Sequence, residues 1–262
     1  MGGNGTEEHP QLSGKPAPPA VAVRFHGALQ DHLSWEDRDR TLNKPLLGPA
    51  SIKDLLESMG VPHPEVGLIL AGGTPVPFPD LAHPGTRYDV YAAWELPVDV
   101  PALPLRPPIP DPPRFVLDVH LGRLASYLRL LGFDTDYERD RDDPALAARA
   151  ADGPRLLLTR DRGLLKRAEV MHGYWLRSTD SKEQAAEVLR RWRLAGHIRP
   201  FTRCLACNGM LAPVAKSDVL PELPPRVAAG YEEFHRCLVC QRVYWPGTHY
   251  ERMLNWVQEL TL

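Results

Sequence analysis

Three short apolar runs, each followed by a segment with helical spacing, lie between residues 114 and 196. The runs cover residues 115–117, 156–158 and 174–176, and residues 133–137 could form a further strand. Apolar runs of this length that end in polar residues are typical of strands buried on both faces. Strands that alternate with helices predict an α/β domain with a parallel sheet over residues 114–196.

The helices between these runs are marked by residues typical of helix ends. Asp143 has the chemistry of an N-cap, with Pro144 at the first helical position. Asp180 and Glu183 form a capping box for a last helix that ends at Gly196. The first helix has one apolar face and ends before Gly132, and that face consists of Leu121, Leu124, Ala125, Leu128 and Leu131.

Residues 20–97 show a different order of elements. Residues 21–25 alternate as a strand does, and residues 51–60 have one apolar helical face with a capping box at the start and a glycine at the end. Two further strands are predicted at residues 66–70 and 87–92. Strands, one helix and then more strands predict an α+β domain of the β-grasp type.

The remaining segments extend or separate these two domains. Residues 1–19 contain few apolar side chains and are expected to be a disordered tail. Residues 98–113 are rich in proline, which predicts a semi-rigid linker. Residues 197–262 hold all four cysteines of the chain and are expected to end in a short helix over residues 255–262.

Composition and charge narrow the class of protein. The chain has 262 residues and a net charge of −2, and no apolar run approaches the roughly 18 residues of a membrane span. The start has no secretory core, so a cytoplasmic protein without membrane contact is expected. Residues 1–113 carry 8 Lys/Arg against 14 Asp/Glu, whereas residues 114–193 carry 16 against 13. The more basic central domain suits a polyanionic substrate.

Acidic residues follow two of the predicted strands closely. Asp118 comes directly after residues 115–117, and Asp161 comes shortly after residues 156–158. Ligands bind at the carboxyl edge of parallel sheets, and Mg²⁺ or Mn²⁺ prefers carboxylate oxygens. Asp118, Asp161 and Asp143 therefore form a candidate divalent-metal site, although Asp143 could be only an N-cap and Asp161 only a turn residue. Further acids that could join them are Asp136, Asp140 and Asp142.

The cysteines form two CxxC pairs, Cys204 with Cys207 and Cys237 with Cys240. Two close pairs supply the tetrahedral thiolate coordination that zinc prefers. Disulfides fit poorly with a cytoplasmic chain, and catalytic dithiols usually occur as a single pair. We therefore expect a zinc ribbon, with a longer insertion between its knuckles than is usual. The possible substitute ligands are His235 and His249.

These motifs resemble known families. The segments FVLDVHLGRLASYLRLLGFDT, DDPAL and LLLTRDRGLL, with the terminal CLVCQRVYWPGTHYERM, resemble the PIN-like nucleases and, among them, the mut-seven C-terminal RNase family. That family joins a PIN-like domain to a zinc ribbon, and some bacterial members carry a ubiquitin-like domain in front. VGLILAGGTPVPF and GTRYDVYAA likewise resemble ubiquitin-like and sulfur-carrier families. Because Trp94 stands where a carrier would have its Gly-Gly tail, a domain that docks a protein partner is expected instead.

The resemblance implies metal-dependent hydrolysis of RNA. Residue by residue, the acid of the first strand maps to Asp118, the acid opening the middle helix to Asp143, and the acid after Thr-Arg to Asp161. A fourth acid has no secure match; Asp180 is a candidate that could equally be a helix cap. His120 is expected to be a neighbour of the site only. The basic residues that could contact RNA phosphates are Arg123, Arg160, Arg162, Lys166 and Arg167.

The sequence leaves two functions open. The first is a metal-dependent ribonuclease with structural zinc and catalytic Mg²⁺ or Mn²⁺. The second is a non-catalytic RNA-binding or ribosome-associated assembly factor with the same fold, which the missing fourth acid favours. The aromatic segment after the second CxxC pair, which begins at Trp245, could stack on RNA bases, but packing of the ribbon is the preferred interpretation.

Overall fold

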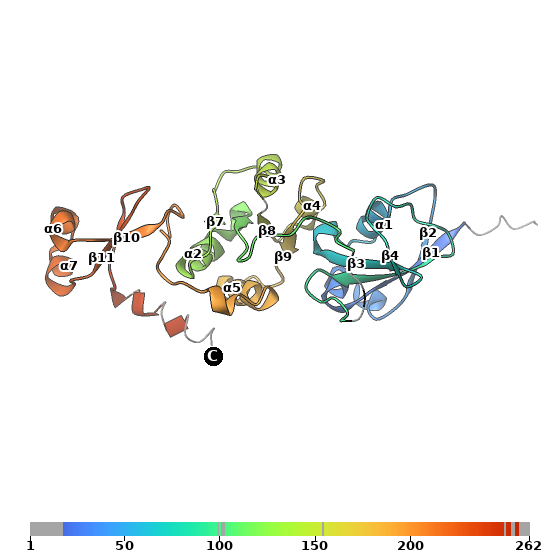
Figure 1. The fold of residues 1–262 in the computed structure, drawn as a ribbon, viewed down its shortest axis with the longest axis horizontal. Helices are drawn as coiled ribbons and strands as arrows, with labels where there is room; N and C mark the ends of the chain where they lie inside the picture. The colour runs from blue at the N-terminus through green and yellow to red at the C-terminus, as the bar shows by residue number, and fades with distance from the viewer. Residues whose placement is uncertain are drawn as a thin grey trace, which may run out of the picture.

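The protein consists of three sheet-containing parts arranged one after another along an elongated molecule (Figure 1). The computed structural model describes residues 18–98, 100, 103–153, 155–248, 250–252 and 255–256. The predicted tail of residues 1–19 falls almost wholly outside this range. Of the predicted last helix, residues 255 and 256 are helical and the rest lies outside the described residues, as does His249.

The N-terminal part is a mixed five-stranded sheet with strand order β2-β1-β5-β3-β4. Its strands are β1 (Ala20–Phe25), β2 (Leu42–Pro45), β3 (Val66–Ala71), β4 (Thr74–Pro75) and β5 (Arg87–Ala92). β1 and β5 run parallel, and the other pairs are antiparallel. Three short 3-10 helices, η1 (Gly27–His32), η2 (Trp35–Asp37) and η3 (His63–Glu65), complete this ubiquitin-like fold.

Helix α1 (Ile52–Ser58) packs on this sheet through Ile52, Leu55 and Leu56, which are buried among the strand residues. Ser51 is the predicted N-cap: its Oγ accepts a hydrogen bond from Asp54 N at 3.1 Å and donates one to Asp54 Oδ2 at 2.7 Å. Gly60 follows with φ +97°, a left-handed conformation that suits a residue without Cβ. The predicted helix and its ends are therefore confirmed.

The central part is an all-parallel sheet with strand order β7-β6-β8-β9. Its strands are β6 (Phe115–Leu117), β7 (Thr135–Asp136), β8 (Leu156–Thr159) and β9 (Gly173–Trp175). The helices are α2 (Gly122–Leu130), α3 (Asp143–Ala151), α4 (Arg162–Leu165) and α5 (Ser181–Arg191), with 3-10 turns η4 (Val119–Leu121) and η5 (Leu194–His197). The parallel α/β fold predicted from the alternating pattern is confirmed.

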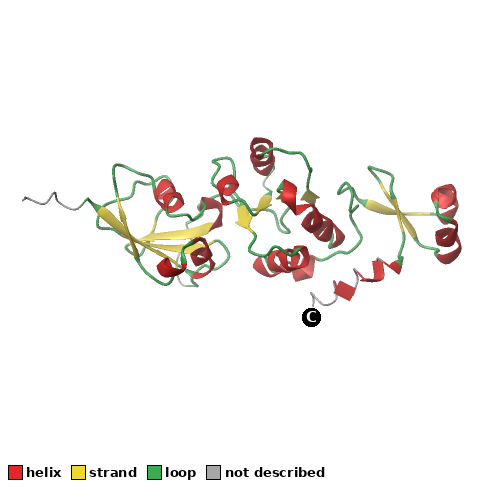
Figure 2. Ribbon diagram, turned by 180° about the vertical axis from the view of Figure 1, so that it is seen from behind, coloured by secondary structure: helices red, strands yellow, loops and turns green. Residues whose placement is uncertain are grey.

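Helices cover both faces of this sheet because side chains alternate along each strand. Phe115, Leu117 and Leu158 point to the face covered by α2 and α5. Val116 and Leu157 point to the other face, which α3 and α4 cover. This three-layer arrangement, visible in Figures 1 and 2, buries the strands on both sides and leaves their carboxyl edge for polar residues.

Three local predictions need correction. The helix predicted to end at Gly196 ends at Arg191, and Gly196 lies within η5. The N-cap of α3 is Asp142, whose side chain accepts a hydrogen bond from Ala145 N at 2.9 Å, so Asp143 is the first helical residue instead. The strand predicted over residues 133–137 pairs only at Thr135 and Asp136. Asp180 caps α5 as predicted, since it accepts from Lys182 N and Glu183 N at 2.9 and 3.0 Å.

The C-terminal part is an antiparallel sheet of β10 (Leu211–Val214), β11 (Phe234–Cys237) and β12 (Val243–Tyr244). Between the CxxC pairs lie α6 (Lys216–Val219), η6 (Leu220–Glu222) and α7 (Pro225–Gly230), which account for the long insertion. Among the described residues, no helix combines the length and apolar character needed to cross a membrane.

Candidate functional site

Asp118 and Asp161 follow the two central strands of the parallel sheet. β6 and β8 are neighbours in parallel register, with Leu117 opposite Leu158, so the chain leaves both strands at the same edge. Asp118 lies directly after β6 and is only 8% exposed. Asp161 follows β8 and is exposed. The structure therefore places both predicted acids at the carboxyl edge, where the pattern predicted them.

A buried threonine, Thr159, connects these two acids. Its hydroxyl donates a hydrogen bond to Asp118 Oδ2 at 2.6 Å and accepts one from Asp161 N at 2.9 Å. One side chain thus fixes the carboxylate of the first acid and the backbone of the second. Sequence analysis did not single out Thr159, although its position between a buried strand and an acid in LLLTRD is a usable signal.

Each acid also caps a short helix. Asp118 Oδ1 accepts a hydrogen bond from His120 N at 3.4 Å at the start of η4. Asp161 Oδ1 accepts one from Gly163 N at 2.6 Å at the start of α4. His120 itself is exposed, which fits a neighbour of the site. These capping bonds orient the Asp118 and Asp161 carboxylates, which are also the candidate metal ligands. Asp161 nevertheless stays exposed.

The other predicted acids occupy different settings. Asp143 is exposed in the first turn of α3, and Asp140 is exposed before that helix. Asp136, at the end of β7, forms ion pairs with Arg141 at 3.1 Å and with Arg149. Burial raises the pKa of Asp136, but the hydrogen bonds and charges of these arginines outweigh burial and lower the pKa below its ordinary value. Asp136 is therefore occupied by structural ion pairs.

The three principal acids do not converge into one ready ligand set. Within the described part of the chain, only the four cysteines bring three or more potential ligand atoms within 4.8 Å of one another. Asp118, Asp143 and Asp161 therefore lie further apart than the ligands of a closed metal site. Asp180, the fourth-acid candidate, uses its carboxylate to cap α5.

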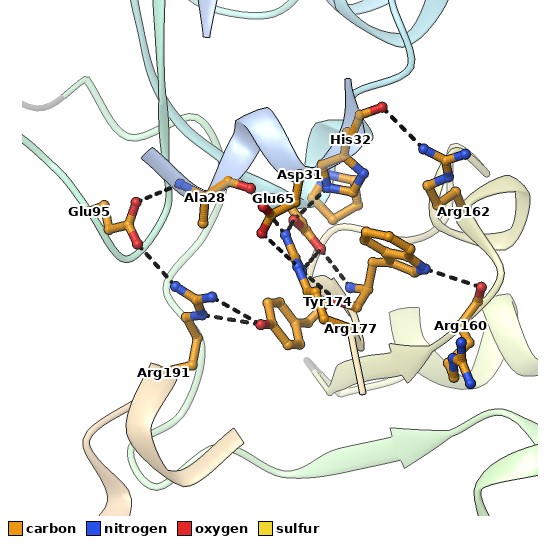
Figure 3. Close-up of polar contacts among 12 residues, drawn as sticks. Ala28, Asp31, His32, Glu65, Glu95, Arg160, Arg162, Tyr174, Arg177 and Arg191 are labelled. Atoms are coloured by element: carbon orange, nitrogen blue, oxygen red, sulfur yellow. Dashed lines mark hydrogen bonds and ion pairs between the residues drawn. The ribbon is translucent and has the colours of Figure 1, made fainter. Parts of the chain in front are cut away.

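The N-terminal domain packs against β9 through a buried ion pair (Figure 3). The Glu65 carboxylate is fully buried and accepts hydrogen bonds from Trp175 N at 2.5 Å and from Arg177 Nη1 and Nη2 at 3.2 and 3.1 Å. His32 Nε2 lies 2.7 Å from Glu65 Oε2. Burial raises the pKa of Glu65, but the hydrogen bond with His32 and the charge of Arg177 outweigh it and hold the pKa below its ordinary value.

The same interface extends to both neighbours of Asp161 (Figure 3). Trp175 Nε1 donates a hydrogen bond to Arg160 O at 3.2 Å. Arg162 Nη1 donates to His32 O at 3.2 Å, and its guanidinium lies 5.3 Å from the centre of the Trp175 ring. The segment that carries Asp161 is therefore tied to β9 on one side and to the N-terminal domain on the other.

The predicted RNA-contacting residues divide between this interface and the surface. Besides Arg162, Lys166 also contacts the N-terminal domain, since its Nζ donates to Glu57 O at 2.8 Å. Arg167 lies 3.7 Å from Glu169 in an ion pair. Arg123 and the side chain of Arg160 are exposed. Contact of these five residues with RNA stays a prediction, as does a protein partner for the N-terminal domain.

The four cysteines come together in the C-terminal sheet. Their sulfur atoms lie within 4.8 Å of one another, with Cys204 Sγ 3.6 Å from Cys240 Sγ and Cys207 Sγ 3.4 Å from Cys237 Sγ. Cys204 and Cys237 are buried, and all four are free thiols. His235 stands outside this group. The cluster has the donor set of a structural zinc site.

The electrostatics of the thiols fit a bound cation. Burial raises the pKa of Cys204, but hydrogen bonds from the Tyr244 hydroxyl and backbone amides lower it to about 6. Burial and the neighbouring sulfurs raise the pKa of Cys207 to about 12. Four sulfurs this close cannot all ionise unless a cation offsets their mutual repulsion. The arrangement is therefore consistent with zinc.

The first CxxC turn is anchored on the central domain. Arg129 of α2 is buried, and its Nη1 donates to Leu205 O and Ala206 O at 3.0 and 2.9 Å. Asn208 Oδ1 accepts a hydrogen bond from Thr135 N at 3.0 Å. Loss of the metal would therefore disturb contacts that reach the central sheet. Sequence analysis did not single out Arg129.

The aromatic segment after the second CxxC pair lines a cavity of about 330 Å³. Trp245, Pro246 and Gly247 form part of its wall, and the Phe201 and Tyr250 rings pack at 3.8 Å between centroids. Phe201 also packs against the core of the central domain, so the contact with Tyr250 joins this segment to that domain. Packing is the role that sequence analysis preferred for it.

Comparisons with known proteins gave two family matches. A family model described as Mut7-C RNAse domain matches residues 113–257, and one described as Mut7-C ubiquitin matches residues 18–96. Neither the curated proteins nor the solved structures gave a match.

Proposed function

The chain belongs to the Mut7-C RNase domain family, and we propose that its central domain is a metal-dependent ribonuclease that hydrolyses RNA phosphodiester bonds. The observation that supports this most directly is the Thr159-linked pair of Asp118 and Asp161 at the carboxyl edge of the parallel sheet. Carboxylates at this edge, held in place by hydrogen bonds, are suited to Mg²⁺ or Mn²⁺.

In this proposal Asp118, Asp161 and Asp143 hold the ion. A divalent ion held there would supply the chemistry of water activation and of stabilising the leaving oxygen in an in-line displacement. Thr159 keeps Asp118 and the backbone of Asp161 in a fixed relation. Asp143 opens α3, which connects β7 to β8 and so begins at the carboxyl edge. Its side chain is exposed at that end of the helix.

The test is cleavage of RNA by the purified full chain with Asp118→Asn and Asp161→Asn. We expect the rate to fall to background in Mg²⁺ and in Mn²⁺, because both charged ligands are lost. Asp152→Asn is the matched control, since Asp152 is exposed at the far end of α3. Cleavage at the parent rate by the double variant would refute the proposal.

A second candidate is a non-catalytic RNA-binding or assembly factor. The separation of the three acids, which form no closed ligand group within 4.8 Å in the described residues, favours it. Calorimetric titration with Mg²⁺ and Mn²⁺ distinguishes the two. The nuclease should bind one of these ions and lose the binding with Asp161→Asn, whereas an adaptor should give no such signal.

A further inference from the structure

A basic, aromatic groove lies where the central domain, the zinc ribbon and the C-terminal segment meet. It encloses about 400 Å³. Arg123 and Tyr127 of α2 line one side, Lys182 of α5 contributes from a neighbouring helix, and Arg252 and Trp256 close the groove from the C-terminal segment. Leu205, in the first CxxC turn, lines its end at the ribbon. Three separate parts of the chain therefore build one concave surface.

The groove begins at the edge of the sheet that carries the acids. Helices that follow parallel strands start at the carboxyl edge, so the first turns of α2 and α5 lie there. Arg123 is in the first turn of α2, which follows Asp118 after a single 3-10 turn, and Lys182 is in the first turn of α5. From Arg123 the lining continues along α2 to Leu130, near the ribbon. In Figure 1 the C-terminal segment runs back from the ribbon toward α5.

The charged residues that the structure describes in the groove lining are all positive. They are Arg123, Lys182 and Arg252, and all three are exposed. In the part of the chain that the structure describes, no carboxylate pairs with any of the three. Lys182 Nζ instead lies 5.6 Å from the centre of the Trp256 ring. These cations are therefore available to an anionic ligand.

Two aromatic rings lie between the cations. The Tyr127 and Trp256 rings pack with centroids 4.7 Å apart at an interplanar angle of 52°. Trp256 is only 7% exposed and mainly fixes the C-terminal segment on α2. Tyr127 is half-buried, so part of its ring remains open to the groove. Alternating positive charge and accessible aromatic surface is the chemistry that binds single-stranded nucleic acid.

We propose that this groove binds single-stranded RNA and leads it between the acidic edge and the zinc ribbon. Arg123, Lys182 and Arg252 contact phosphates, and a base stacks on the open part of Tyr127. The proposal rests on RNA being the substrate, as in the proposed function. It implies that the zinc ribbon, through Leu205, lies beside the bound RNA.

The experiment measures binding of a fluorescein-labelled 12-nucleotide oligouridine to the full chain by fluorescence anisotropy, without added Mg²⁺ or Mn²⁺. Each cation of the groove is changed singly to alanine, and all three together. For single strands, the slope of log affinity against log salt should become shallower by about 0.7 for each phosphate that no longer meets a cation. Tyr127→Leu should weaken binding at least about fivefold, the lower end for loss of a stacked base.

Matched controls separate the groove from general charge. Arg190→Ala on α5 and Arg226→Ala on α7 remove one exposed arginine each away from the groove, and both should leave affinity and salt slope near the parent values. Melting temperature and zinc content confirm that each variant is folded. Unchanged affinity in the folded triple variant, or equal affinity for a 12-base-pair duplex through the same residues, would overturn the proposal.

The outcome is separable from that of the proposed function. Asp118→Asn should bind the oligonucleotide as the parent does while losing cleavage. If the triple variant binds normally and Asp118→Asn abolishes cleavage, the groove is wrong and the nuclease stands. If the triple variant loses binding and the double aspartate variant still cleaves, the groove stands and the proposed acidic site is wrong.

Discussion

Replacing Glu65 with glutamine should loosen the N-terminal domain from the central domain. The carboxylate accepts from Trp175 N and from both terminal nitrogens of Arg177, and His32 Nε2 lies 2.7 Å away. A glutamine has the same size but carries no charge. It also turns an NH₂ group toward nitrogens that are themselves donors. Arg177 then keeps its charge in a largely buried setting, with Asp31, at 3.3 Å, as its remaining acidic partner.

The expected loss of stability is about 3 kcal/mol. Removing one member of a buried ion pair usually costs about 3–5 kcal/mol. The lower end applies because the Arg177 side chain is 20% exposed and retains Asp31. Glu95→Gln is the control at the same interface, since Glu95 pairs with Arg191 at 3.0 Å but is 41% exposed. A solvated pair of this kind should contribute less than about 1 kcal/mol.

Urea unfolding of the full chain, followed by circular dichroism and by hydrogen exchange at Trp175 N, measures both variants. Glu65→Gln should lower the urea midpoint and speed exchange at Trp175 N, because that amide loses its charged acceptor. Trp175 Nε1 also donates a hydrogen bond to Arg160 O, next to Asp161. Glu65→Gln should therefore also weaken the binding of Mn²⁺. If Glu65→Gln lowers stability no more than Glu95→Gln, the buried pair does not hold the domains together.

Three further predictions concern the acidic edge, pH and the metal. Thr159→Val keeps the shape but removes the hydroxyl between Asp118 and Asp161, so it should cost about 1–3 kcal/mol in urea unfolding and reduce RNA cleavage; a variant with parent stability would refute the role of the hydroxyl. Because the pKa of Glu65 is lowered in the folded state, its contribution is present above its ordinary pKa of 4.5 and is lost as pH falls through lower values. The parent should therefore lose stability below about pH 4.5 more steeply than Glu65→Gln, and parallel profiles would contradict this assignment. Chelation of zinc, or Cys204→Ser, should unfold the C-terminal sheet while far-ultraviolet dichroism of the other two parts persists; unchanged melting after zinc loss would exclude a structural role.

Local patterns predicted those elements whose determinants lie within a few residues. The cap at Ser51, the cap at Asp180 and the two CxxC turns each depend on short-range chemistry, and all three formed as predicted. The cap of α3 was displaced by one position, because Asp142 and Asp143 are adjacent and both have suitable side chains. β2 and β4 were missed because they are short strands that gain stability from pairing with β1 and β3.

Contacts between distant segments could not be predicted in the same way. Glu65 is separated by 112 residues from Arg177, and nothing in the local pattern around either residue indicates a fully buried pair. The role of Thr159 could have been predicted from the sequence. A threonine at the end of a buried strand, close to an acid, has a hydroxyl that can hydrogen-bond to neighbouring carboxylates and backbone amides. Whether Asp143 joins Asp118 and Asp161 depends on side-chain position at the start of α3, which helix periodicity does not determine.

The position of the N-terminal domain also concerns the solubility of the protein. β9 is the last strand of the parallel sheet, and its outward amide at Trp175 would be an unpaired donor without Glu65. Exposed strand edges of this kind invite pairing with another chain and aggregation. Gly173 of β9 lies close to Pro64, which has no amide hydrogen to offer a further strand. The N-terminal domain thus covers this edge of the central sheet, and a chain shortened to begin at residue 113 should aggregate where the full chain stays monodisperse.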